Sequence, residues 1–309
     1  MSKVLIGAGG WSYFRVPGMD SLRAYSMAFD FVEVNSTFYT WPSLSLVHSW
    51  RSRVPEDFEF TLRCHKSITH SHMLATNDYV VKALNKTAEI YKILKASLLV
   101  IETPQTLSLQ TLPIERLESF FKLCLSLDMK LAWEARGLIS LPQPYKDLMK
   151  EFDVAHCVDL SLKEPEVETS TIYSRIFGKG EHNIYQFTDE ELLEINEKAE
   201  RHGKTMICFH GVRMYTDAAR LKAYRKTGIF PKATKSVGIE SVREVILEEN
   251  VRFPISRDEL NRCCGWRVFD LTEDKRIRLS TILSKLPATK YQSLSHLLND
   301  LSKVIKDIT

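Results

Sequence analysis

The sequence lacks the signals of an exported or membrane-spanning protein. No apolar run approaches the roughly 20 residues that a helix needs to cross a bilayer. The start of the chain, Met1–Gly10, has no basic segment followed by an apolar stretch and a small-residue cleavage site. We therefore expect a cytoplasmic protein that does not associate with membranes.

Cysteines at zinc-site spacing and an excess of charge of either sign are also missing. The chain carries 42 Lys and Arg residues against 39 Asp and Glu residues, a formal net charge of +3. This balance neither requires nor excludes a nucleic-acid partner. We expect free, mostly buried thiols that pack as small apolar groups. The cysteines are Cys64, Cys124, Cys157, Cys208, Cys263 and Cys264.

Eight short apolar, β-branched runs recur along the chain, each followed by polar residues and then by helical periodicity. Runs that are apolar at nearly every position are typical of parallel strands covered by helices on both faces. Eight such units favour a closed (β/α)₈ TIM barrel, an α/β fold, over an open doubly wound sheet. The predicted strands are Val4–Gly7, Phe29–Val34, Phe58–Arg63, Leu98–Glu102, Lys130–Glu134, Val154–Asp159, Ile172–Phe177 and Thr205–Phe209.

Local signals refine this plan. Thr188 and Glu191 have capping-box spacing and predict a helix that begins at Asp189. After the eighth run the pattern becomes helical throughout, so we predict a barrel over residues 1–231, a linker over 232–238 and a small C-terminal helical domain over 239–309. The predicted helices of that domain are Ile239–Glu249, Arg257–Cys263, Leu279–Leu286 and Ser293–Ile308.

The residues that follow the predicted strands are unusually polar. In TIM barrels the catalytic groups come from the carboxyl ends of the strands and the loops after them. Buried carboxylates such as Glu33, Glu102 and Glu134 need either solvent or basic partners. Any single Glu–Arg pair is as often structural as functional, but most of these strands end in ionisable side chains. The available basic partners are Arg63, Lys66, Arg136 and Arg175.

Basic residues beside aromatic residues fit a phosphate or carboxylate whose attached ring or base stacks on them. We predict Glu33 or Glu134 as general base and His70 as general acid. The predicted substrate-binding residues are Trp11, Tyr13, Asn35, Tyr39, Arg63, Lys66, Arg136, Arg175 and His210.

Metal and nucleophile chemistry have weaker support. The spacing of the metal-ligating types is not diagnostic, and four basic residues on the same rim would repel a cation. We therefore assign no metal ligand and no cofactor, and leave a divalent metal open. Cys64 precedes His65, but adjacent strand residues face opposite sides, so no catalytic triad is indicated. The metal-ligating types considered are His65, His70, His72, His210, Glu102, Glu134 and Asp159.

Two strings, Ile6–Tyr13 and Phe31–Tyr39, resemble the YecE-like family, domain of unknown function 72. The resemblance runs from about Lys3 to Ile229 and implies a TIM barrel of uncharacterised activity. The chain departs from the family pattern at Phe14–Gly18 after the first strand and at Phe209–Gly211 after the eighth, where the family has a double asparagine. The other stretches of this chain that resemble the family are Phe58–Phe60, Lys66–His70, Trp133–Arg136 and Tyr173–Arg175.

Three functions stay open from the sequence. The leading hypothesis is a hydrolase or related enzyme, such as a phosphoester hydrolase or an endonuclease-like enzyme, acting on a small anionic or phosphate-bearing substrate, a nucleotide or nucleic acid. The second is a non-catalytic module that binds an anionic metabolite or nucleic acid and recruits a partner through the helical tail. The third is a metal-dependent sugar isomerase or lyase. The sequence predicts no particular oligomeric state.

Overall fold

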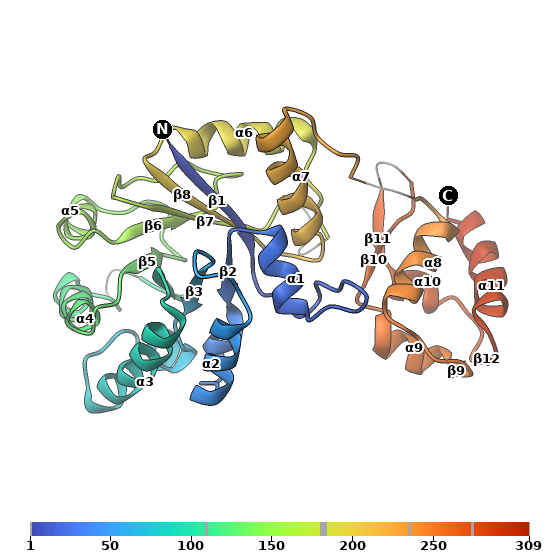
Figure 1. Ribbon diagram of the computed structural model, residues 1–309, viewed down its shortest axis with the longest axis horizontal. Coiled ribbons are helices and arrows are strands. Elements are labelled where there is room, and N and C mark those ends of the chain that lie inside the picture. Colours follow the sequence, from blue (N-terminus) through green and yellow to red (C-terminus); the bar gives the residue numbers. More distant parts are fainter. Residues whose placement is uncertain (1, 109–110, 180–183, 234–235, 273–274, 309) are drawn as a thin grey trace. The chain divides into compact units, whose positions relative to one another are not determined.

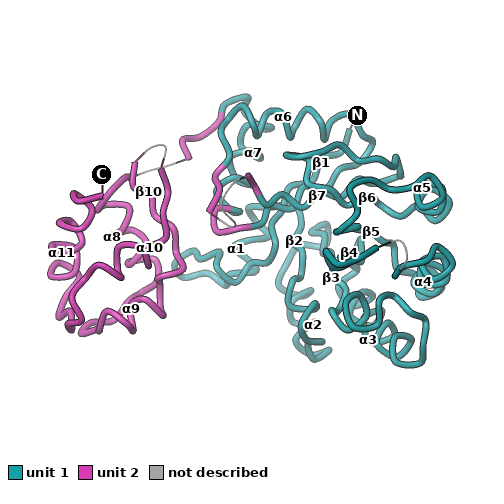
Figure 2. The backbone as a smooth tube through the Cα atoms, turned by 180° about the vertical axis from the view of Figure 1, so that it is seen from behind, with its two compact units in different colours: residues 1–177, 187–210, 214–229 teal, residues 178–186, 211–213, 230–309 magenta. Residues whose placement is uncertain are grey.

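The structure is a computed structural model that describes residues 2–108, 111–179, 184–233, 236–272 and 275–308. It divides into two compact units (Figure 2). The predicted domain limits stay a prediction, and residues 234 and 235 of the predicted linker lie outside the described residues. Unit 1 comprises Met1–Phe177, Phe187–His210 and Met214–Ile229; unit 2 comprises Gly178–Gln186, Gly211–Arg213 and Phe230–Thr309.

Eight parallel strands of unit 1 close into a barrel in chain order, with β1 pairing both β2 and β8 (Figure 1). This confirms the predicted (β/α)₈ TIM barrel, and every predicted strand agrees with the observed one to within two residues at each end. The strands are β1 Lys3–Ala8, β2 Phe31–Val34, β3 Glu59–Arg63, β4 Leu98–Glu102, β5 Leu131–Glu134, β6 Ala155–Val158, β7 Ile172–Ile176 and β8 Lys204–Phe209.

Helices follow β1 to β5, β7 and β8. The predicted capping box is confirmed, because the Thr188 and Glu191 side chains each accept a hydrogen bond from the other residue's backbone N–H. The sequence predicted a helix after every strand, and this prediction is wrong after β6. Residues 159–171, all of them described, form turns and bends around Pro165. Proline disfavours the interior of a helix. The helices are α1 Ser21–Ala28, α2 Leu44–Ser52, α3 Asp78–Leu94, α4 Ile114–Ser126, α5 Gln143–Glu151, α6 Asp189–Glu200 and α7 Met214–Thr227, with a 3₁₀ turn η1 Asn35–Phe38 and a π turn η2 Ser67–Ser71.

The barrel interior changes character along its axis. Side chains two residues apart on a strand face the same side of the sheet. One apolar cluster lines the interior. Ionisable residues lie two positions further toward the carboxyl ends of several strands, which places them together at that end. The cluster consists of Leu5, Phe31, Leu98, Val100, Ala132, Ala155, Cys157, Tyr173, Met206 and Cys208; the residues two positions beyond its members include Glu33, Glu102, Glu134, Asp159, Arg175 and His210.

A buried histidine on β6 makes the stability of the barrel depend on pH. The Nδ1 atom of His156 accepts a hydrogen bond from the backbone N–H of Glu166 at 2.9 Å, and burial lowers the pKa of His156 from 6.5 to about 4. The unfolded chain therefore binds more protons than the folded chain between these values. The stability that neutral His156 contributes is present above pH 6.5 and is lost as the pH falls toward 4.

We expect wild type to lose about 3 kcal/mol more of its free energy of unfolding than His156→Gln between pH 7 and pH 4. Urea unfolding of both proteins at a series of pH values measures this difference. Parallel pH profiles for the two proteins would contradict the assignment.

Unit 2 contains the predicted helices and also short strands that the sequence did not predict. The strands form two antiparallel pairs, β10 with β11 and β12 with β9. Runs of two or three residues are too short to show strand periodicity. In the part of the chain that the structure describes, no helix combines the length and apolarity needed to span a membrane. The elements are α8 Ile239–Glu248, β9 Ile255–Ser256, α9 Arg257–Cys264, β10 Val268–Asp270, β11 Arg276–Arg278, α10 Leu279–Leu283, β12 Lys290–Tyr291 and α11 Leu294–Lys306.

Candidate active site at the carboxyl ends of the barrel strands

Three glutamates and three arginines form one ion-pair network, which we call the charged network, at the carboxyl ends of the strands. Their formal charges sum to zero. The network joins β2, β3, β4, β5 and β7, so residues far apart in the sequence meet because their strands end at the same side of the barrel. Its members are Glu33, Arg63, Glu102, Glu134, Arg136 and Arg175.

Arg175 is the centre of the charged network. Its Nη1 donates to Glu102 and to Glu134, and its Nη2 lies 3.1 Å from Glu33 Oε1. The residue is only 2% exposed. Although burial acts to lower it, these carboxylates hold the pKa of Arg175 well above its ordinary value. Arg175 is therefore enclosed by carboxylates, which engage its Nη1 and Nη2 atoms; its predicted role in binding a substrate anion stays a prediction.

Arg63 and Arg136 complete the charged network nearer to solvent. Arg63 Nη2 lies 2.7 Å from Glu102 Oε2, while Arg136 donates to Glu102 Oε1 at 3.0 Å and to Glu134 Oε1 at 2.6 Å. Burial acts to raise the pKa of Glu102, but the charges of Arg175, Arg63 and Arg136 hold it below its ordinary value. The side chains of Arg63 and Arg136 are 14% and 30% exposed, so solvent or a ligand reaches both.

Glu33 lies deeper than the sequence suggested. It is fully buried, and its Oε2 accepts a hydrogen bond from the Tyr173 hydroxyl at 2.9 Å. His210 Nε2 lies 3.6 Å from the other oxygen, Oε1. Burial, reinforced by Arg175, holds the pKa of His210 well below its usual range, so this ring is neutral at neutral pH. A neutral imidazole therefore adjoins a sealed carboxylate.

Gly9, directly after β1, makes room for this arrangement. A Cβ at Gly9 would lie 2.5 Å from the His210 ring and 2.7 Å from Asn35 Nδ2. The predicted residues Asn35 and His210 are thus brought together across the end of β1. Phe177 stacks on the His210 ring with centroids 4.7 Å apart, which fixes the ring plane.

His70 lies beside the charged network in the turn η2. Its Nδ1 shares a hydrogen bond with Thr69 Oγ1 at 2.8 Å, and its ring packs edge-on against Phe38, over which the Arg63 guanidinium lies at 3.8 Å. Burial, the main cause, lowers the pKa of His70. A ring that is neutral at pH 7 accepts a proton more readily than it donates one; the general-acid role predicted for His70 stays a prediction.

The remaining predicted residues lie in more exposed surroundings. The ammonium group of the exposed Lys66 lies 5.4 Å from the ring centre of Tyr39, which is 58% exposed. Trp11 packs edge-on against Trp50 of α2, and Tyr13 is 57% exposed. These aromatic residues offer surface for stacking and are not members of the charged network.

Several buried polar atoms of the site have no hydrogen-bond partner in the described structure. Two are donors on arginines and the others are acceptors or an imidazole nitrogen. Buried polar atoms nearly always have a partner, so water or a bound ligand at this end of the barrel would satisfy them. The atoms are Arg63 Nε, Arg175 Nε, Glu33 Oε1, Asn35 Oδ1 and His210 Nε2.

The site also contains residues to which the sequence gave no catalytic or binding role. Glu102 bridges all three arginines, and Tyr173 and Cys208 lie two residues before Arg175 and His210 on the same strands. Strand alternation is the signal that could have found Tyr173 and Cys208. Ligand atoms of Glu33, Cys208 and His210 all lie within 4.8 Å of one another, a geometry that could hold a metal ion, although the sequence assigned no metal ligand.

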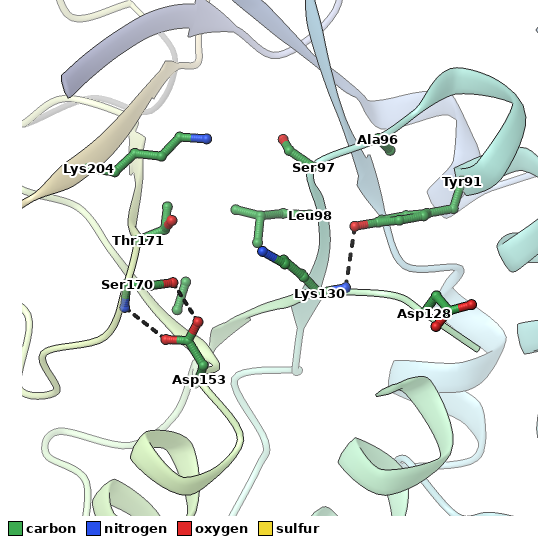
Figure 3. A pocket seen from close by; sticks show the side chains of 11 residues that line it. Tyr91, Ala96, Ser97, Leu98, Asp128, Lys130, Asp153, Ser170, Thr171 and Lys204 are labelled. Atoms are coloured by element: carbon green, nitrogen blue, oxygen red, sulfur yellow. Dashed lines mark hydrogen bonds between the residues drawn. The ribbon is translucent and has the colours of Figure 1, made fainter. Parts of the chain in front are cut away.

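A pocket of about 330 Å³ lies at the opposite end, where β4 to β8 begin (Figure 3). Its wall includes Lys130, Lys204 and Asp153, and Asp153 is bonded to Ser170. None of the predicted site residues lines it. Because TIM barrels place catalytic groups at the carboxyl ends of their strands, we locate the candidate active site at the charged network and not at this pocket.

The family model described as "Protein of unknown function DUF72" matches residues 5–231, which include the whole charged network. The chain belongs to the DUF72 family. The match confirms the resemblance seen in the sequence, and it covers the barrel of this DUF72 protein.

The chain is similar to other proteins of this family in sequence or in fold. UPF0759 protein YecE of Escherichia coli K12 is 32% identical over 80 residues, which are 25% of this chain and 29% of that protein. A DUF72 family protein of Thermotoga maritima has a TM-score of 0.57 at 20% identity over 72% of this chain and 99% of its own. A second, of Enterococcus faecalis, has a TM-score of 0.55 at 15% identity over 74% and 99%. These likenesses carry the fold alone.

Proposed function

We propose that this DUF72 protein is a hydrolase that acts on a phosphate-bearing substrate, a nucleotide or nucleic acid, at the carboxyl ends of its barrel strands. The observation that carries the proposal is the pair of solvent-reachable guanidinium groups, Arg63 and Arg136, held beside a half-buried neutral imidazole, His70. Arginine binds phosphate oxygens through paired N–H groups, and a neutral imidazole removes a proton from water.

The arginines keep N–H donors for a substrate while paired with carboxylates. A guanidinium has five N–H donors. The ion pairs with glutamates engage Nη2 of Arg63, and Nε and Nη1 of Arg136. Their glutamate partners hold both groups in place before the substrate arrives, which is what stabilisation of developing phosphate charge requires. The exposed Lys66 adds a positive charge on the solvent side.

His70 is the general base of the proposed reaction. Glu33 is sealed from solvent, and Glu134 is bound by two arginines, so neither carboxylate is the base that we propose. His70 takes a proton from water, the water oxygen bonds to phosphorus, and the ester P–O bond breaks. The proton then passes from His70 to the leaving oxygen, which restores the neutral ring.

Arg136→Ala is expected to weaken pyrophosphate binding by about 10-fold or more, since hydrogen bonds to charged groups contribute about 1.5–3 kcal/mol. Isothermal titration calorimetry in the presence of EDTA measures this affinity. The matched control is Arg23→Ala, an exposed arginine on α1, which should bind as wild type does. Equal affinities for all three proteins, or no binding by wild type, would contradict the proposal.

Measuring product formation distinguishes the proposed hydrolase from a binding module without catalytic activity. Wild type is incubated with phosphomonoesters, nucleotides and abasic single- and double-stranded DNA, and released phosphate or cleaved strands are measured. Product formation that Arg136→Ala reduces supports the hydrolase. Binding of pyrophosphate without product from any of these substrates would favour a binding module.

A further inference from the structure

Three side chains of metal-ligating type, one of them the network member Glu33, converge at the edge of the charged network. Glu33 comes from β2, and Cys208 and His210 come from β8 and its end; these two strands flank β1. A carboxylate oxygen, a thiol sulfur and an imidazole nitrogen from the three residues lie within 4.8 Å of one another. Gly9, at the end of β1, lies against the His210 ring, and a Cβ there would come within 2.5 Å of it.

Two of the three ligand atoms have no hydrogen-bond partner. Glu33 is fully buried, the His210 side chain is 8% exposed, and Glu33 Oε1 and His210 Nε2 lie 3.6 Å apart without a hydrogen bond from the described residues. One group bound between them would satisfy both. A water molecule could do so, but it would gain little from the Cys208 sulfur, which is a weak hydrogen-bonding atom. Sulfur, nitrogen and oxygen together form a donor set that suits a transition metal.

The surroundings hold two ligands in fixed orientations. Tyr173 donates a hydrogen bond to Glu33 Oε2 at 2.9 Å, which leaves Oε1 toward His210. Phe177 stacks on the His210 ring. Contacts of this kind, made by residues behind the ligands, orient them and raise metal affinity.

The local charge tolerates a cation. Arg175 lies 3.1 Å from Glu33 Oε1, but Glu102 and Glu134 also bind this arginine. The three arginines of the charged network are balanced by its three glutamates, so the network has no net positive charge. A Cys208 thiolate, formed when a metal binds, adds a negative charge.

We propose that Glu33, Cys208 and His210 bind one divalent transition-metal ion of the zinc class. Three protein ligands are the number that catalytic zinc sites use, whereas structural zinc sites use four. On binding, the Cys208 thiol releases its proton to solvent and the sulfur bonds to the metal. This inference goes beyond the proposed phosphate hydrolysis and does not depend on it, because metal binding is measured without substrate.

Titration with Co²⁺ tests the site on the full chain after EDTA treatment and dialysis into phosphate-free buffer. We expect one Co²⁺ per chain, a sulfur-to-cobalt charge-transfer band, and one released proton. Cys208→Ser should lose the band. His210→Ala should weaken binding more than about 100-fold, since even residues behind the ligands account for 10–100-fold. Cys124→Ser, at a buried cysteine on α4, is the control and should keep both the band and the affinity.

Absence of saturable Co²⁺ and Zn²⁺ binding by wild type would overturn the metal proposal, and so would a band that survives Cys208→Ser. Circular dichroism checks that each variant is folded. His210 lies beyond the end of β8, so His210→Ala provides the test should Cys208→Ser unfold: unchanged affinity in that variant overturns the proposal by itself. Pyrophosphate binding in EDTA reports on the hydrolase separately, so failure of one proposal is distinguishable from failure of the other.

Discussion

Arg175→Met is expected to lower the free energy of unfolding by about 3–5 kcal/mol, because it leaves three carboxylates close together without their shared cation. Methionine fills much of the same volume, so loss of packing contributes little. Glu33 is affected most, since it is fully buried and Arg175 lies 3.1 Å from its carboxylate. Urea unfolding at pH 7, with circular dichroism as the probe, measures the change.

A double variant separates charge from packing in this result. Arg175→Met combined with Glu33→Gln removes one negative charge from the unbalanced set. We expect it to be more stable than Arg175→Met alone, a non-additivity typical of residues in one ion-pair network. Simple addition of the two single effects would show that Arg175 acts through its volume and not through its charge.

His70→Gln is expected to reduce phosphoester hydrolysis by about 10²–10⁴-fold, the range for loss of a general base. Pyrophosphate affinity should change little, because the arginines that bind the anion remain. Burial lowers the pKa of His70, so the neutral ring predominates at pH 7, and the rate of wild type should fall as the pH drops below 6.5 and the ring takes up a proton. Steady-state rates measured from pH 5 to pH 8 test both expectations.

His72→Gln is the matched control for His70→Gln. His72 directly follows the turn η2 and stacks on Tyr79 with centroids 4.5 Å apart. Its replacement should leave the rate and the acid limb of the pH profile unchanged. An equal loss of rate in both variants would indicate that the turn itself, and not the His70 imidazole, supports the reaction.

Most of the barrel could be predicted because each strand is a short apolar run that can be recognised from its own residues. Leu98–Glu102 is apolar up to its last residue, and this one run predicted both a buried strand and a charge at its carboxyl end. The closure of eight such strands then brings the charges together. The two-residue strand Lys290–Tyr291 shows the opposite case, since it carries no periodicity and forms only by pairing with Ile255–Ser256.

The roles within the site were less predictable, because they depend on contacts across the barrel. Arg175 was expected to bind substrate, but its reach to carboxylates on β2, β4 and β5 depends on strand order and register, which no local pattern specifies. Likewise, the sequence predicted Cys208 only as a buried thiol that packs as a small apolar group. Only its position two residues before His210, on the same inward side of β8, brings its sulfur near Glu33.

The location of a bound phosphate analogue tests the central claim most directly. A crystal of the protein soaked in tungstate, whose metal scatters anomalously, would show where a tetrahedral oxyanion binds. The account predicts a peak within hydrogen-bond distance of Arg63 and Arg136, on the side of His70. A peak at the opposite pocket beside Lys130 and Lys204, with none at the two arginines, would contradict it.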